Sequence, residues 1–145
     1  MNSFTSVSLE PPLVAVCIHE RSSVLPDFLR AGRFGLNVLA EDQRRLSTRF
    51  SCNRHHSFEE LDWSYGRIGV PLLSGVLAAL ECRLERVVPA GDHHILIGRV
   101  SAITTYDGAP LLVFRSQYHL LRPMDSMDEV AETAPESAET IGSRR

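Results

Sequence analysis

The sequence predicts a mainly β domain with short helices. Six or seven segments show the alternation or the continuous apolar runs that are typical of strands, whereas only two show helical spacing. The strands do not alternate regularly with helices, so a parallel sheet of βαβ units is not expected. A β-barrel or a β-sandwich with helical connections fits this pattern.

The first two strands are expected at residues 4–8 and 13–18. In the first, apolar residues alternate with small hydroxylated ones, and the segment ends at a rigid turn made by Pro11 and Pro12. The second is apolar throughout, which predicts burial on both of its faces.

A short helix is expected next. Ser22 or Ser23 is placed to cap its N-terminus, Pro26 falls in its first turn, and Gly32 ends it. Three apolar residues form its buried side: Leu25, Phe28 and Leu29.

A third strand is expected at residues 33–40 and a second helix at 41–50. The helix begins with two acids and ends near an arginine, as its dipole favours. Leu46 and Phe50 stand four residues apart and form its buried side. Residues 51–69 are expected to be a polar loop with aromatic side chains, and loops of this length are often functional.

Residues 76–88 fit two structures. Their apolar positions suit a helix face, but from Leu80 onward apolar and polar residues alternate as in a strand, and periodicity alone does not decide. A turn at residues 90–92 follows, and Asp107 with Gly108 is a strong hairpin signal. The remaining strands are expected at residues 94–105, 111–114 and 118–121.

Composition limits the classes of function. The 145 residues suffice for one domain, and 43% hydrophobic residues argue against a disordered chain. Residues 1–123 carry thirteen Arg against twelve acids, which provides no basic face for a nucleic acid. Residues 124–145 carry two Arg against six acids, so 123–145 is expected to be an acidic, disordered tail.

The chain gives no sign of export. Its apolar runs are too short to span a membrane, and its N-terminus lacks the pattern of a secretory signal. Cys17, Cys52 and Cys82 form an odd, widely spaced set without a paired metal-binding motif. Cys17 and Cys82 lie in apolar stretches and are expected in the core. A reducing cytoplasm is the expected location.

Two segments near the N-terminus carry candidate binding groups. Residues 2–8 place hydroxyls and an amide along one strand, which could bind a polar planar ring or could form an ordinary Ser/Thr-rich edge strand. Arg21, Ser22 and Ser23 combine a guanidinium with two hydroxyls, which suits either a phosphate site or a plain helix cap.

Two later segments are also candidates. In Gly91–Asp92–His93, a histidine beside a carboxylate could carry a proton, donate a hydrogen bond or simply occupy a loop. A metal site is not expected, because adjacent histidines point apart on a strand. Residues 115–119 could line a pocket or form a polar hairpin edge. Since no nucleophile–base set is present, an enzyme of this sequence would depend on a cofactor.

In their order, these segments resemble the flavin reductase-like family of split-barrel FMN-binding proteins, which includes the small reductase components of two-component monooxygenases. The resemblance is collinear over residues 2–122. Its main stretches read NSFTSVSLEPP, FGLNVL, GDHHILIGRV and PLLVFRSQYHLL.

The resemblance implies a split β-barrel in which residues 76–88 are mainly strand. It also implies a cytoplasmic homodimer that uses FMN or FAD and is reduced by NADH or NADPH. The implied activity is that of an NAD(P)H:flavin oxidoreductase, and the implied partner is an oxygenase that receives reduced flavin.

The resemblance also assigns residues to roles. His93 is expected on the nicotinamide side as the catalytic residue. The residues expected to bind the cofactors are Asn2, Ser3, Phe4, Ser6 and Val7 along the flavin ring, Arg21, Ser22 and Ser23 at its phosphate, Phe50 and Ser51 as further flavin contacts, and Ser116, Gln117 and Tyr118 on the nicotinamide side.

The sequence departs from the family at two points. Family members usually begin some thirty residues earlier with a helix and a strand, so either the true start lies upstream of Met1 or this chain is a shortened relative. Arg115 and Ser116 stand where many relatives have a small residue and a glycine. These departures leave open a flavin-binding module without reductase turnover, or a truncated inactive relative.

Overall fold

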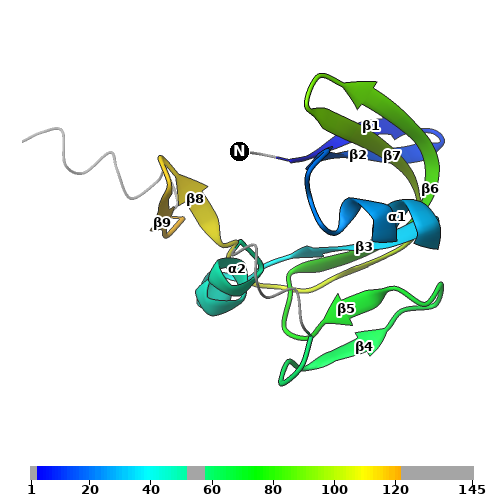
Figure 1. Ribbon diagram of the computed structural model, residues 1–145. Coiled ribbons are helices and arrows are strands. Elements are labelled where there is room, and N and C mark those ends of the chain that lie inside the picture. Colours follow the sequence, from blue (N-terminus) through cyan, green and yellow to red (C-terminus); the bar gives the residue numbers. More distant parts are fainter. Residues whose placement is uncertain (1–2, 52–57, 122–145) are drawn as a thin grey trace, which may run out of the picture.

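The computed structural model describes residues 3–51 and 58–121, and its main feature is one curved antiparallel sheet (Figure 1). The strands follow the order β1-β2-β7-β6-β3. The prediction of a mainly β chain with short helices is therefore confirmed. The bounds of the five strands are β1 (Phe4–Leu9), β2 (Pro12–His19), β3 (Arg33–Val38), β6 (Ala78–Ala90) and β7 (His93–Thr105).

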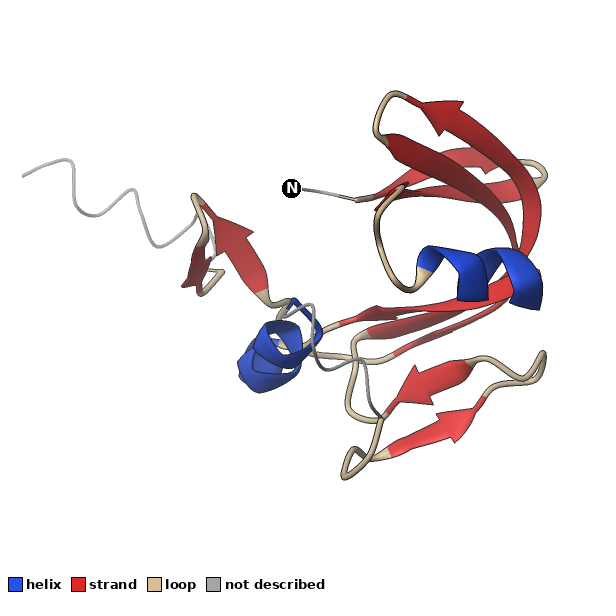
Figure 2. Ribbon diagram, viewed as in Figure 1, coloured by secondary structure: helices blue, strands red, loops and turns tan. Residues whose placement is uncertain are grey.

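Two short hairpins and two helices complete the described fold (Figure 2). The hairpins are formed by β4 (Trp63–Tyr65) with β5 (Pro71–Leu73) and by β8 (Leu112–Phe114) with β9 (Gln117–His119). The helices are α1 (Leu25–Ala31) and α2 (Arg44–Ser51), the latter preceded by the 3₁₀ turn η1 (Glu41–Gln43).

The hairpin of β6 and β7 contains the two longest strands of the sheet. Each strand has thirteen residues, and their pairing is interrupted by register shifts at Glu81/Cys82 and Leu84/Arg86. Such bulges bend a strand and increase its twist. The sheet accordingly curls, and α1 packs its Phe28 against the core inside the curve.

The apolar core has two parts. The first is formed by Val14, Phe34, Leu80 and Cys82, where β2, β3 and β6 meet. The second surrounds Leu73, Val76 and Ala79, and both predicted apolar residues of the second helix, Leu46 and Phe50, pack against it. The helix is thus held by the face that its sequence predicts.

The structure resolves several open points. Residues 76–88 are mainly strand, as the family resemblance implies. Cys82 is fully buried as expected, but the prediction for Cys17 is wrong, because this residue of β2 is exposed. Only Val14 and Ala15 are buried in β2, so burial on both faces holds for that part of the strand alone.

Three local predictions are wrong or incomplete. The residue that caps α1 is Val24, so neither Ser22 nor Ser23 is an N-cap. Asp107 and Gly108 do not form a hairpin, because the backbone on either side of them bonds to other segments: Tyr106 N–H donates to the Leu77 carbonyl and Glu41 N–H donates to the Ala109 carbonyl. The chain instead crosses to Ala40, which forms a bridge with Pro110. The predicted loop at 51–69 contains β4.

Two further expectations fall outside this description. The predicted acidic tail, 123–145, lies outside the described residues, which end at residue 121. Among the described residues, no helix has the length and apolar character needed to cross a membrane.

The packing at Gly98 generates the first testable prediction. A Cβ added to Gly98 would lie 2.4 Å from Cζ of Phe34 and 3.1 Å from Cβ of Cys82, which is overpacking in the first core cluster. We expect G98A to lower the free energy of unfolding by about 1–3 kcal/mol. The matched control is G91A, whose Cβ would meet nothing within 4 Å and whose cost, about 1 kcal/mol, comes from the positive φ of +64° alone. Urea unfolding of both variants measures the difference, and equal losses would contradict this account.

Candidate functional site

A cavity of about 710 Å³ opens between the end of β2, the turn that follows it and the start of α1. Its size is that of a site for a small molecule or cofactor. The polar residues that line it are Ser3, Cys17, His19, Arg21, Ser22 and Ser23, and the apolar ones are Val16, Ile18, Val24 and Phe28.

The lining has two kinds of chemistry. A guanidinium, an imidazole and three serine hydroxyls stand on the polar side, and no carboxylate is among the lining residues. Such a set favours an anionic group such as a phosphate. The apolar side chains offer contact area to a flat ring. The cavity can therefore accept a ligand that combines a ring with a negative charge.

Backbone hydrogen bonds hold the cavity wall in place. The N–H of Cys17 donates to the carbonyl of Ser3 at 2.7 Å, which ties the start of β1 to β2. In the turn, the N–H of Ser22 donates to the carbonyl of His19 at 2.9 Å, and that of Leu25 donates to the carbonyl of Ser22 at 3.2 Å. Because Val24 caps α1, the hydroxyls of Ser22 and Ser23 are not used as helix caps and can face a ligand.

A histidine–carboxylate pair lies next to this wall. Asp92, in the turn between β6 and β7, accepts a hydrogen bond of 2.6 Å from Nδ1 of His93. That bond holds the pKa of Asp92 below its usual range. The rings of His93 and His19 meet edge to face with centroids 5.0 Å apart. His93 thus adjoins the cavity through His19.

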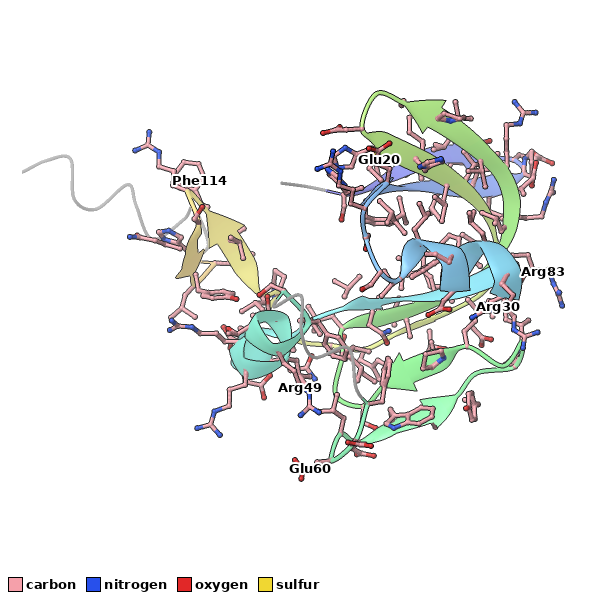
Figure 3. All side chains as sticks on the ribbon, in the orientation of Figure 1. Glu20, Arg30, Arg49, Glu60, Arg83 and Phe114 are labelled. Atoms are coloured by element: carbon pink, nitrogen blue, oxygen red, sulfur yellow. The ribbon has the colours of Figure 1, made fainter. Side chains whose placement is uncertain are left out.

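The other predicted site residues gather in a second region, around α2 and the hairpin β8–β9. The Tyr118 hydroxyl donates to Ser47 at 3.0 Å, and the Arg44 guanidinium lies 4.8 Å from the centre of its ring. Hydrogen bonds with Ser47 and, to a smaller extent, with Thr48 lower the pKa of Tyr118. Figure 3 shows Phe114 at the tip of this hairpin, well away from Glu20 beside the cavity.

Phe50 and Ser51 have local partners in this second region. Phe50 packs against Phe58 with ring centroids 5.3 Å apart, and the Ser51 hydroxyl donates to the carbonyl of Thr48 at 2.9 Å. Ser116 is in the turn of the β8–β9 hairpin with a φ of 62°, and Gln117 begins β9.

The structure thus brings one part of the predicted set together. Ser3, Arg21, Ser22 and Ser23 line a single cavity, and His93 adjoins it. Phe4, Ser6 and Val7 lie along exposed β1, which continues from Ser3, while Asn2 lies outside the described residues. Phe50, Ser51, Ser116, Gln117 and Tyr118 lie in the second region and do not line this cavity.

Sequence reasoning missed three residues of the cavity. Cys17 and Phe28 were interpreted as core residues, although both line its wall. His19 was interpreted as part of a polar turn, although it directly ends the apolar run of β2. A polar residue that follows a buried strand is a signal that could have identified it. Within residues 3–51 and 58–121, no group of three metal-ligating side chains is present.

Comparisons with known proteins agree with this geometry. The family model described as "Flavin reductase like domain" matches residues 1–122. The chain is 40% identical over 122 residues to the flavin-dependent monooxygenase reductase subunit HsaB of Rhodococcus jostii, covering 83% of this chain and 63% of that protein. It is 45% identical over 111 residues to the FMN reductase (NADH) SmoA of Agrobacterium fabrum, covering 77% and 63%.

A solved structure gives the same result for the fold. The NADH:FAD oxidoreductase SgcE6 of Streptomyces globisporus, in complex with NAD and FAD fragments, is 33% identical with a TM-score of 0.77, covering 84% of this chain and 75% of that one. The predicted split-barrel architecture is thereby confirmed. The chain spans between 32% and 63% of the length of the first curated relatives it matches.

The two described cysteines are expected to differ sharply in reactivity. Burial raises the pKa of Cys82 to about 11, whereas Cys17 is exposed in the cavity wall. At about pH 8, only roughly one Cys82 in a thousand would be a thiolate, which is the reactive form. Iodoacetamide should therefore modify Cys17 in the folded protein and Cys82 only after unfolding. Trypsin cleavage at Arg21, Arg67 and Arg83 separates the two peptides for mass spectrometry. Equal labelling of both in the folded state would contradict the described burial.

Proposed function

Because the chain belongs to the flavin reductase like domain family, we propose that it is an NAD(P)H:flavin oxidoreductase that supplies reduced FMN or FAD to a partner monooxygenase. The observation that carries the proposal is the cavity in which Ser3 meets Arg21, Ser22 and Ser23. These residues come from two segments that the family resemblance assigns independently to the flavin ring and to its phosphate.

The residues present fit a flavin nucleotide. The Arg21 guanidinium and the hydroxyls of Ser22 and Ser23 would hold the phosphate, since the cavity wall includes no competing carboxylate. Ser3 and the neighbouring positions Asn2, Phe4, Ser6 and Val7 of the first strand would lie along the ring. The exposed side chains of β1 leave that strand accessible to a ligand.

When bound, the flavin supplies the acceptor for a hydride that NAD(P)H donates. The protein itself would hold the flavin ring and the nicotinamide ring against each other in the orientation that hydride transfer requires. We assign His93 to the nicotinamide side. Its Nδ1 is engaged by Asp92, so its Nε2 is the nitrogen left to contact a substrate.

The names of two relatives guide the choice of nucleotides. Both SmoA and SgcE6 are named for NADH, whereas one is named for FMN and the other for FAD. We therefore propose NADH as the reductant, with FMN or FAD as the acceptor. The relative HsaB is named as a monooxygenase reductase subunit, which supports an oxygenase as the partner.

We also propose that the protein acts as a homodimer in the cytoplasm. The hairpin β8–β9 and the chain beyond it expose apolar side chains that a second copy would cover: Val113, Phe114, Leu120 and Leu121 are each 55–68% exposed. Such a dimer would give the second region, with Phe50, Ser51, Ser116, Gln117 and Tyr118, a route to the cofactors. The free thiol of Cys17 suits a reducing compartment.

The activity is tested with the purified chain, NADH and added FMN or FAD. We expect flavin-dependent loss of the near-ultraviolet absorbance of NADH. H93A should raise the KM for NADH or lower kcat by roughly tenfold or more while changing the Kd for flavin less than about twofold. The control is H94A, the next residue of β7. An equal loss of flavin binding and NADH use in H93A would contradict the role of His93. Flavin binding without any NADH consumption would favour a flavin-binding module instead.

The position of the flavin is tested through Cys17. Because Cys17 lines the cavity, bound FMN should slow its alkylation by iodoacetamide, by roughly tenfold at an FMN concentration of about ten times Kd. Alkylation of free cysteine in the same tube serves as the control. Unchanged labelling of Cys17 under saturating FMN would place the flavin elsewhere.

A further inference from the structure

His19 joins the two halves of the proposed site. It ends β2, lines the cavity, and has 43% of its side chain exposed. Its Nδ1 accepts a hydrogen bond of 3.0 Å from the backbone N–H of Arg21. Its Nε2 lies 3.7 Å from Oδ2 of Asp92, and its ring meets that of His93.

The two ring nitrogens of His19 have different roles. A ring nitrogen that accepts a hydrogen bond carries no proton, so Nδ1 is unprotonated while it accepts from the N–H of Arg21. Nε2 lies on the side of Asp92, whose other oxygen is bonded to His93. At 3.7 Å this second contact is too long for a hydrogen bond, so the bond from the Arg21 N–H is the one that holds the ring.

We propose that His19 is a positioning residue for the flavin phosphate: its neutral imidazole holds the backbone of Arg21, and with it the turn through Ser23, in the shape that presents the phosphate-binding groups. This inference rests on the proposed function. It concerns a residue to which the family resemblance gives no role.

The hydrogen bond makes the arrangement sensitive to pH. A proton on Nδ1 would turn the acceptor into a donor that faces the N–H of Arg21, so this bond is lost when His19 becomes charged. Histidine changes charge within the range of about pH 5 to 8. The affinity for FMN is therefore expected to be lower at about pH 5.5 than at about pH 7.5.

The charged groups around His19 come from three segments. Asp92 and His93 face it from the β6–β7 turn and the start of β7, and Glu20 and Arg21 follow it in its own turn, 3.9 Å apart at their nearest charged atoms. Phe28 of α1 and Val24, the residue before that helix, line the cavity with apolar side chains. Ser3, just before β1, is uncharged. Asp92 is thus the carboxylate with a direct contact to the His19 ring.

Two substitutions separate the proposed role from a merely structural one. H19A removes the acceptor. H19N keeps an acceptor, because an Asn side-chain oxygen bonds readily to the backbone N–H two residues on, and this acceptor does not titrate. Riboflavin, which has the flavin ring without the phosphate, is the matched ligand for FMN.

The experiment measures the Kd of FMN and riboflavin by flavin fluorescence at about pH 5.5 and 7.5 for the three proteins. At the higher pH, we expect H19A to weaken FMN binding roughly three- to tenfold and riboflavin binding less than about twofold. H19N should bind FMN nearly as well as the unchanged protein. H19N should also lose less FMN affinity between about pH 7.5 and 5.5 than the wild-type protein does. The FMN phosphate itself titrates at about pH 6, but it does so equally with both proteins, so the difference between their pH dependences reports on His19.

Several outcomes would overturn the inference. Equal FMN affinity in H19A and the unchanged protein would do so, and so would equal weakening of FMN and riboflavin, which indicates a general structural role. If H19A proves unfolded in a thermal melt, the pH slopes of H19N and the unchanged protein decide, and identical slopes refute the proposal. If the wild-type protein binds no flavin, the proposed function is overturned as well. Flavin binding and NADH turnover with an unaffected H19A would overturn the role of His19 alone.

Discussion

The register of β2 against β7 is the constraint on which the candidate site depends. This antiparallel ladder pairs His19 with His93 at its end, and so brings the turn after β2 against the Asp92 turn. Because side chains alternate between the faces of a sheet, a slip of one residue would move His19 to the opposite face. The cavity wall, the carboxylate and both imidazoles would then separate, although every strand could still form.

The core explains why that register is kept. Val14 of β2 is buried in the first core cluster, so a slip of one residue would move it to the other face and away from Phe34 and Cys82. On the same sheet, Gly98 leaves the space that the ring of Phe34 occupies, next to fully buried Cys82. The ring of Phe34 in β3 thus reaches over β7 only because position 98 carries no side chain.

The sequence allowed most elements to be predicted, because their periodicity is local. It did not allow their neighbours to be predicted. Residues 76–88 could not be assigned from periodicity, since their apolar positions suit a helix face while the residues from Leu80 onward also alternate as in a strand. Gly108 failed as a hairpin signal because the backbone around it bonds to Leu77 and Glu41, which are distant in the sequence. Cys17 and His19 belong to the site only through the pairing of β2 with β7, which no local pattern records.

One carboxylate lies beside both imidazoles of the site. Asp92 is exposed, so its pairing adds little to the stability of the fold; it is hydrogen-bonded to His93 and lies 3.7 Å from Nε2 of His19. In the proposed enzyme, His93 serves the nicotinamide side and His19 holds the turn for the flavin phosphate. The turns that carry Asp92 and Arg21 are joined by the hydrogen bond from the N–H of Glu20 to the Asp92 carbonyl, so the two parts of the proposed site are fixed to each other through the backbone rather than through the side chain of Asp92.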